Sequence, residues 1–532
     1  MKQPCDEGLI RAGTAGAPCL EKSRRWVLAA TILGSSMAFI DSTAVNVALP
    51  ALQSSLHATV VDVQWVIESY GLFLSALILM GGALGDSLGR RAMFLLGVAA
   101  FAAASAGCGL SSSIKGLLAW RSIQGIAAAF LVPGSLAIIS SSFDPEYRGK
   151  AIGTWAGFTT ITTAVGPVLG GWLIEHASWH WVFLINVPLA GLVLGISLGH
   201  VPESRRSETT RVDWLGAAIV TLSLAALVYG FLEWPILGWT HPRAIGSLIL
   251  GSGLLVVFLF VEKAVKSPMV PLSLFKSASF SGANLLTLCL YAAVGIFFFL
   301  FPLNLIQVQH YSATATGAAA LPMILLMFLL SRWSGGLITR FGAKTPLIVG
   351  PLIAAAGFLL FAVPGVRADY WTAFLPAFVV LGLGMAISVA PLTTVVMNSV
   401  GQERAGTASG INNSVARVAG VLAVAVLGAV MVAAFAYSLG DSVAGLNLNA
   451  DIVHELESNV DRLGSLDAPS NADPQVALTI RSAVAGAFVF GFRRIMVLCA
   501  VLAISGAVVA WRRIPSRNAA SAAVFGGVGA AN

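Results

Sequence analysis

The chain contains repeated apolar runs of about twenty residues, the length that a helix needs to cross the hydrocarbon core of a membrane. We count fourteen runs between residues 26 and 511, separated mostly by short polar links. The runs are continuous and rich in Gly and Ala, whereas the strands of a membrane barrel alternate apolar and polar residues. The composition, 57% hydrophobic and 10% charged, agrees with this pattern. We therefore expect an all-α membrane protein with fourteen transmembrane helices.

The Lys and Arg residues indicate how the chain lies in the membrane. With an even number of spans both termini fall on one side, and most of the 31 basic residues lie in the tails and in the links on that side. Because cytoplasmic loops carry an excess of Lys and Arg, we expect both termini to be cytoplasmic. The net charge of +7 forms no basic stripe, so the lipid bilayer, and not a nucleic acid, is the expected partner.

An internal repeat lies at two links between spans. The stretch MGGALGDSLGRR, Met80 to Arg91, is matched by the looser copy SGGLITRFGAK, Ser334 to Lys344. Aligning the copies places Gly89 opposite Gly342. A membrane chain built from two related halves is typical of secondary transporters, which bind substrate near the bilayer midplane where the halves meet.

The repeat predicts two six-helix bundles joined by two extra transmembrane helices. The expected parts are a cytoplasmic tail at 1–25, a first bundle at 26–201, a linker with the extra helices at 202–278, a second bundle at 279–511 and a cytoplasmic tail at 512–532. The second bundle includes an acidic extracytoplasmic segment at about 436–490, in which residues 451–463 have helical spacing. This segment is interpreted as a solvated linker, or as a gate or docking surface for a periplasmic adaptor.

Two acids inside predicted spans are candidates for a proton site. Asp41 lies well inside the first span, where lipid penalises the charged form of a carboxyl group and favours uptake of a proton. Its alternative role is that of a structural acid paired with a base. Glu68 shares one face of the second span with Gln64 and Ser75, so it should point away from lipid. Alternatively, Glu68 is an acid wetted from the exterior.

Basic and polar residues in other spans complete the candidate pathway. Arg121 and Gln124 share one face of the fourth span, and a buried Arg needs partners. If Arg121 faces Asp41 or Glu68, movement of one helix against another would switch the proton affinity of that acid; alternatively, Arg121 contacts carbonyl groups near the surface. In the second half the pathway candidates are Asn413, Arg417 and Tyr291. The aromatic side chains near Tyr291 are interpreted as pocket lining or as lipid-facing.

The chain shows no pattern typical of an enzyme or a metal site. The five Cys have no paired spacing, and we find neither a nucleophile with its base nor a phosphate-binding loop. We therefore expect a transporter with no cofactor other than protons as the coupling ion. No carboxylate lies in the last six spans, so a neutral or singly charged hydrophobic small molecule is the expected substrate.

These motifs resemble those of the major facilitator superfamily, and in detail its fourteen-helix drug:proton antiporter branch. The resemblance covers roughly residues 26 to 435 and rests on IDSTAVNVALP from Ile40, the loop at 82–91, RSIQG from Arg121, GPVLGG from Gly166 and WHWVFLINVP from Trp179. It implies proton-coupled efflux of hydrophobic or amphipathic compounds such as drugs across a bacterial inner membrane. Export of a specific lipid or biosynthetic metabolite is the alternative.

The resemblance also implies roles for individual residues. Asp41 would bind protons or substrate, and Arg121 would couple proton movement to transport. The residues implied as a cytoplasmic latch are Asp86, Gly89, Arg90 and Arg91, and those implied as an antiporter motif are Gly166, Pro167, Gly170 and Gly171. Ser87 and Thr339 depart from the family pattern in the two loop copies, which predicts a weaker or asymmetric latch.

Overall fold

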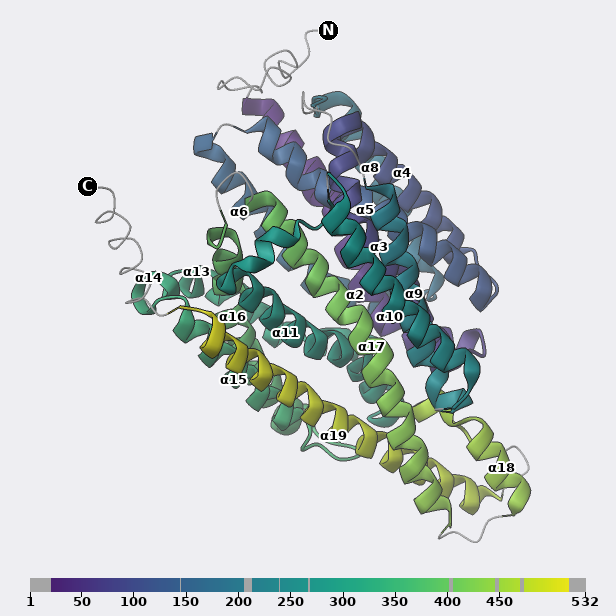
Figure 1. The fold of residues 1–532 in the computed structure, drawn as a ribbon. Coiled ribbons are helices and arrows are strands. Elements are labelled where there is room, and N and C mark those ends of the chain that lie inside the picture. The colour runs from purple at the N-terminus through teal and green to yellow at the C-terminus, as the bar shows by residue number, and fades with distance from the viewer. Residues whose placement is uncertain are drawn as a thin grey trace. The chain divides into compact units, whose positions relative to one another are not determined.

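The computed structural model describes residues 21–143, 145–204, 213–238, 240–266, 268–400, 405–444, 449–468 and 473–515. Over these residues the chain consists of helices joined by short links (Figure 1). Fourteen of the helices are long and apolar enough to cross a membrane, which confirms the predicted number. Most of the predicted tails, 1–25 and 512–532, lies outside the described residues.

The chain divides into two compact units, the first of which comprises residues up to Val270 together with Leu305–Ala318. Its helices are α2 (Glu21–Ser55), α3 (Val60–Leu88), α4 (Arg90–Gly109), α5 (Ile114–Ser142), α6 (Pro145–His176), α7 (His180–Leu184), α8 (Asn186–His200), α9 (Trp214–Leu237) and α10 (Pro242–Ala264). The main packed pairs are α3 with α5, α4 with α5, α2 with α6 and α9 with α10. The predicted boundaries of bundle and linker stay a prediction.

Small residues let the helices of the first unit approach closely. A Cβ on Gly125 of α5 would lie 3.1 Å from the Tyr70 backbone of α3, and one on Gly97 of α4 would lie 2.9 Å from the Leu131 amide nitrogen of α5. Around these contacts, Phe94 and Phe101 are fully buried in an apolar core. Close approach of backbones at Gly and Ala is how helices associate in lipid, where the hydrophobic effect does not drive them together.

Residues 305–318 join the first unit through polar contacts. Gln307 Nε2 donates to Gln53 Oε1 at 2.9 Å. The Thr314 amide donates to Glu175 Oε1 at 2.8 Å, near the end of α6. These bonds hold the start of α12 (Ala313–Ala319) beside α2 and α6.

The second unit comprises Pro271–Asn304 and the chain from Ala319 onward. Its helices are α11 (Ala278–Leu303), α13 (Leu321–Gly335), α14 (Leu337–Phe341), α15 (Lys344–Phe361), α16 (Leu375–Asn398), α17 (Ala405–Ala444), α18 (Ala450–Ser458) and α19 (Pro474–Arg513). Phe297 and Phe301 of α11 are buried against Phe361 and Phe378, with ring centroids 4.7 to 6.0 Å apart. These two aromatic residues therefore form packed core, and do not face lipid as one interpretation held.

The repeated loops adopt related backbone conformations. Gly89, between α3 and α4, has φ 124°, and its aligned partner Gly342, between α14 and α15, has φ 75°. Positive φ strains residues that carry a Cβ, so glycine suits both positions. The structure thus supports the alignment of the two copies.

The acidic segment at 436–490, which was predicted to be extracytoplasmic, contains the expected short helix. Residues 450–458 form α18, and a 3₁₀ turn follows at Val460–Ser465. Leu456 of the helix and Leu463 of the turn are buried while Glu455 and Glu457 are exposed, so the helix is amphipathic.

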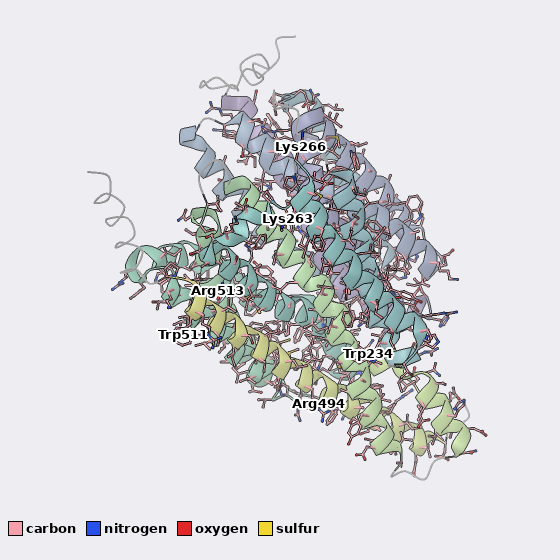
Figure 2. All side chains as sticks on the ribbon, viewed as in Figure 1. Trp234, Lys263, Lys266, Arg494, Trp511 and Arg513 are labelled. Atoms are coloured by element: carbon pink, nitrogen blue, oxygen red, sulfur yellow. The ribbon has the colours of Figure 1, made fainter. Side chains whose placement is uncertain are left out.

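Farther on, Trp511 and Arg513 lie at the C-terminal end of α19 (Figure 2). This placement is typical of a membrane–water interface.

Candidate transport site

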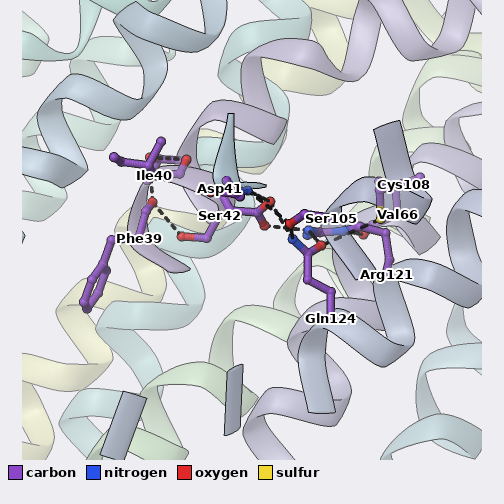
Figure 3. Close-up of polar contacts among 11 residues, drawn as sticks. Phe39, Ile40, Asp41, Ser42, Val66, Ser105, Cys108, Arg121 and Gln124 are labelled. Carbon is purple, nitrogen blue, oxygen red and sulfur yellow. Dashed lines mark hydrogen bonds and ion pairs between the residues drawn. The ribbon is translucent and has the colours of Figure 1, made fainter. Parts of the chain in front are cut away.

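The centre of the first unit holds a buried ion pair between α2 and α5. Arg121 Nη1 lies 2.6 Å from Asp41 Oδ2, and both side chains are almost completely inaccessible, at 1% and 0% exposure (Figure 3). Of the interpretations offered for Arg121, the structure supports contact with Asp41. A buried charge is tolerated when it is paired and hydrogen-bonded, and both members meet that condition.

Polar side chains complete the coordination of the pair. Gln124 Nε2 donates to Asp41 Oδ1 at 2.9 Å and Asn186 Nδ2 donates to the same atom at 3.2 Å. Gln124 Oε1 accepts from Arg121 Nη1 at 2.6 Å. Ser105 Oγ accepts from Gln124 at 2.7 Å and from Asn186 at 3.2 Å (Figure 3). Each carboxylate oxygen of Asp41 therefore has its own donors.

Two members of this network, Asn186 and Ser105, were not among the predicted site residues. Asn186 begins α8, directly after Ile185, whose backbone is itself helical. The packing of α8 on α2 brings the amide beside Asp41, which is 145 positions away in the chain. The signal in the sequence was the run NVP inside an otherwise apolar span. Ser105 carried no such signal, because serine is common in membrane helices.

The helix α3 supplies two further contacts of Arg121. Arg121 Nε donates to the Val66 carbonyl oxygen at 3.0 Å. The guanidinium carbon lies 4.3 Å from the centroid of the Tyr70 ring, a cation–π contact. Because Gly125 lies one turn after Arg121 and allows α3 close to α5, the small residue of the RSIQG motif permits these contacts.

The predicted antiporter motif packs behind Asp41. A Cβ on Gly166 of α6 would lie 3.1 Å from the Ile40 carbonyl oxygen, and one on Gly170 would lie 2.8 Å from Ala44 Cβ. On the same helix Pro167 and Gly171 approach residues 313–317. The motif thus brings α6 against the segment of α2 that carries the acid, in agreement with the predicted tight packing.

Glu68 lies on α3 with a different environment from that of Asp41. Its side chain is 0% exposed, and neither carboxylate oxygen has a hydrogen-bond partner among the residues that the structure describes. Gln64, one turn earlier, is also buried, with an unpartnered Nε2. The prediction that this face points away from lipid agrees with the burial. The alternative interpretation, that Glu68 is an acid wetted from the exterior, does not agree with it.

The predicted latch residues surround a carboxylate that the sequence did not single out. Glu203, after the end of α8, accepts hydrogen bonds from the Arg91 and Ala92 amides at 3.1 and 3.0 Å. The Arg90 amide donates to the Ser204 carbonyl oxygen at 2.8 Å. Acids stabilise the positive end of a helix, so Glu203 caps α4. The Asp86 side chain lies outside the described residues.

We expect replacement of Glu203 by Ala to destabilise the first unit by about 1 kcal/mol, because the α4 cap is lost. Thermal unfolding of purified protein measures the effect. Glu457→Ala, at an exposed position on α18, is the matched control and should leave the unfolding temperature unchanged. Equal unfolding temperatures for the two variants would contradict the capping role.

The pathway candidates of the second unit are separate features of α11 and α17. Asn413 is exposed, whereas its neighbour Asn412 donates to Asn284 Oδ1 at 3.2 Å and to Thr287 Oγ1 at 2.7 Å. Arg417 and Tyr291 are half-buried. The amide that joins α17 to α11 is therefore Asn412, which was not among the predicted residues. The roles of Asn413, Arg417 and Tyr291 stay predictions.

Fourteen helices that could cross a membrane, and within the first unit a buried, hydrogen-bonded ion pair, define a polytopic membrane protein with an intramembrane charged site. The sequence matches the family model of the Major Facilitator Superfamily over residues 31–424. The chain belongs to this superfamily of transporters, and it is therefore a multi-pass transporter and not an enzyme.

The relatives of this chain are resistance and efflux proteins. It is 33% identical over 497 residues to the tetracenomycin C resistance and export protein of Streptomyces glaucescens, covering 92% of this chain and 91% of the relative. It is 35% identical to the puromycin resistance protein of Streptomyces alboniger, covering 83% and 88%, and 34% identical to the multidrug resistance protein Stp of Mycobacterium tuberculosis, covering 78% and 77%. The chain is thus a member of the fourteen-helix drug-resistance branch.

Solved structures agree in fold. A crystal structure of a bacterial homologue of the human lysosomal transporter Spinster superposes with a TM-score of 0.62 at 18% identity, covering 93% of this chain and 97% of that one. The peptide transporter homologue PepTSo2 superposes with a TM-score of 0.57 at 12% identity, covering 92% and 98%. At these identities the likeness concerns the fold alone.

Proposed function

We propose that this protein exports hydrophobic or amphipathic compounds, neutral or singly cationic and including drugs, across the bacterial cytoplasmic membrane in exchange for protons. The observation that carries the proposal is the Asp41–Arg121 pair, buried in the membrane-spanning core with every Asp41 oxygen hydrogen-bonded. Ionisable residues inside membrane spans are costly and mark ion or substrate pathways. The drug-resistance relatives support the class of substrate.

In this proposal Asp41 exchanges its contact with Arg121 for a proton. A proton on Asp41 would cancel the charge that holds Arg121, so α2 and α5 would lose their ionic contact. Binding of substrate and of a proton would then favour different arrangements of the helices, which is the requirement for coupling. Both termini are proposed to be cytoplasmic, and Asp86, Gly89, Arg90 and Arg91 to act as a latch on that side.

The pathway candidates enter the proposal with defined roles. Gln124 orients Asp41 through its hydrogen bond. Asn413, Arg417 and Tyr291 are proposed to contact substrate from the second half, and the antiporter motif around Gly166 to keep α6 on α2. A periplasmic adaptor on the segment at 436–490 is not part of the proposal, because the comparisons add no support for one.

The test is transport by purified protein in liposomes with an imposed pH gradient. We expect a fluorescent hydrophobic monocation to move against its gradient only while the proton gradient is present, and collapse of the gradient by a protonophore to stop it. Movement of the dye that is indifferent to the pH gradient would refute proton coupling.

A second candidate is export of one biosynthetic metabolite. The name of the Streptomyces glaucescens relative, which combines resistance with export of a single compound, favours it. Resistance of an expressing strain to a panel of unrelated toxic compounds separates the two candidates. Broad resistance supports multidrug efflux, and resistance confined to one compound supports a dedicated exporter.

We expect Glu68→Gln to slow proton-driven export and to flatten its pH dependence, because a buried carboxyl group without a partner is suited to carry a proton. The amide keeps the shape and removes the titration. Transport rates across a pH series in liposomes measure the effect, with Glu457→Gln on α18 as control. A wild-type pH profile in the Glu68 variant would exclude a proton-carrying role.

A further inference from the structure

The two linker helices contain a second buried acidic site that the transport site does not use. Asp213 precedes α9 and Glu262 lies in the last turn of α10, where these antiparallel helices meet. Asp213 is 7% exposed and Glu262 is 2% exposed. Figure 2 shows Lys263 and Lys266 near this end of the helix pair and Trp234 near the other.

Each of these acids accepts a hydrogen bond from a backbone amide with one of its carboxylate oxygens. Asp213 Oδ1 accepts from the Gly216 amide at 2.8 Å, which caps α9. Glu262 Oε2 accepts from the Val270 amide at 3.0 Å, which folds the chain back after α10. The other two oxygens, Asp213 Oδ2 and Glu262 Oε1, are buried and have no donor among the described residues.

These two unpartnered oxygens lie beside the same residue, Gly216. A Cβ there would be 3.1 Å from Glu262 Oε1 and closer still to Asp213 Oδ2, so the two carboxyl groups are neighbours. Two carboxylates contain no donor, so a hydrogen bond between them requires one proton. Two like charges at this separation and burial would repel strongly.

Among the described residues, no ion pair involves either acid. From α3 and α4, Met80, Leu84 and Met93 form an apolar cluster with Ala217 at this end of α9. On α10 and after it, Lys263 and Lys266 are exposed. A proton shared between the two oxygens would satisfy both.

We propose that Asp213 and Glu262 form a proton-binding site that is distinct from the Asp41 site and fastens the linker helices to one another beside α3. The shared proton joins the start of α9 to the end of α10. Through Ala217, the same end of α9 packs on Met80 and Leu84, where α3 enters the loop at 82–91. Loss of the proton would leave two facing charges and loosen this junction.

The proposal is tested by replacing either acid with its amide. In Asp213→Asn or Glu262→Gln the amide nitrogen donates to the remaining carboxylate, so the hydrogen bond persists while the proton is no longer needed. Glu233→Gln, at the opposite end of α9, is the matched control. Infrared spectra at neutral pH should show one protonated-carboxyl band in wild type and in the control that both amide variants lack, apart from any band of Glu68, which all of these proteins share.

Thermal unfolding provides an independent measurement. Because the folded state holds the shared proton more tightly than the unfolded chain, the stabilisation is present at lower pH and is lost as the pH rises. Relative to wild type, both amide variants should lose most of this alkaline fall in unfolding temperature. If the band persists in both variants, or if their unfolding follows pH as the wild type does, the proposal is wrong.

A further variant covers the case in which neither amide variant can be purified. Asp213→Leu combined with Glu262→Met replaces both acids by apolar groups, an exchange that buried charged groups commonly tolerate. It should fold and lack both the band and the alkaline fall. None of these measurements depends on transport, so their failure and that of the efflux proposal are distinguishable.

Discussion

Replacement of Asp41 by Asn should abolish proton-coupled export while leaving the protein folded in the membrane. The amide keeps the size of the side chain and can still accept from one donor, but it cannot take up and release a proton. Arg121 would lose its counter-charge, and breaking a buried pair in this way costs about 3 kcal/mol. We therefore expect lower stability together with a complete loss of coupling.

The measurement is dye export in liposomes under an imposed pH gradient, normalised to the amount of folded protein. Asp441→Asn, at an exposed position on α17, is the matched control and should transport normally. Facilitated movement of dye down its own gradient should survive in the Asp41 variant, which separates loss of coupling from loss of the pathway. Retained coupling in Asp41→Asn would exclude Asp41 as the proton site.

Replacement of Arg121 by Ala should change the pH profile of transport and reduce its rate. The guanidinium is the counter-charge of the Asp41 carboxylate, since Nη1 lies 2.6 Å from Oδ2. Without it the ionic contact that we propose to exchange for a proton is absent. Lysine should not restore activity, because a single ammonium group cannot reach Asp41, Gln124 and the Val66 carbonyl in the planar geometry that arginine provides.

A double-mutant cycle tests whether the contact between Asp41 and Arg121 causes the loss of stability in the single variants. We expect Asp41→Asn combined with Arg121→Gln to be more stable than the sum of the single changes predicts, by about 1 to 3 kcal/mol, because no unpaired charge remains. Unfolding of the four proteins in detergent supplies the numbers. Additive losses would show that the two residues act separately, and an unchanged pH profile in Arg121→Ala would break the proposed link to Asp41.

Much of the candidate site was predictable because membrane spans make ionisable residues conspicuous. Asp41, Glu68 and Arg121 stand out against long apolar runs, and the helical spacing of Arg121 and Gln124 places both on one face. The structure bears out that placement, since both bond to Asp41. Helical spacing did not identify Asn186 as a partner of Asp41, because its position depends on the packing of α8 on α2.

In the loop at 82–91 and in the second half of the chain, the sequence pattern was insufficient to identify which residues make the contacts. Glu203 lies after the first bundle in a short polar link, and only the packing of α8 on α4 brings it to the amides of Arg91 and Ala92. In α17 the face that was predicted to line the pathway does not include Asn412, the amide that bonds to α11. A polar face several residues wide does not specify which of its members meets a partner helix.

The sequence by itself determined the number of membrane helices, the repeated loops and the depth of the ionisable residues. These follow from transfer of each residue between water and lipid, which is local and adds along the chain. Tertiary structure alone decided that Asp41 meets Arg121, Gln124 and Asn186, and that Asp213 meets Glu262. A hydrogen bond forms only when the distance between donor and acceptor is within a few tenths of an ångström of its preferred value. For residues far apart in the chain, only the packing of helices sets that distance.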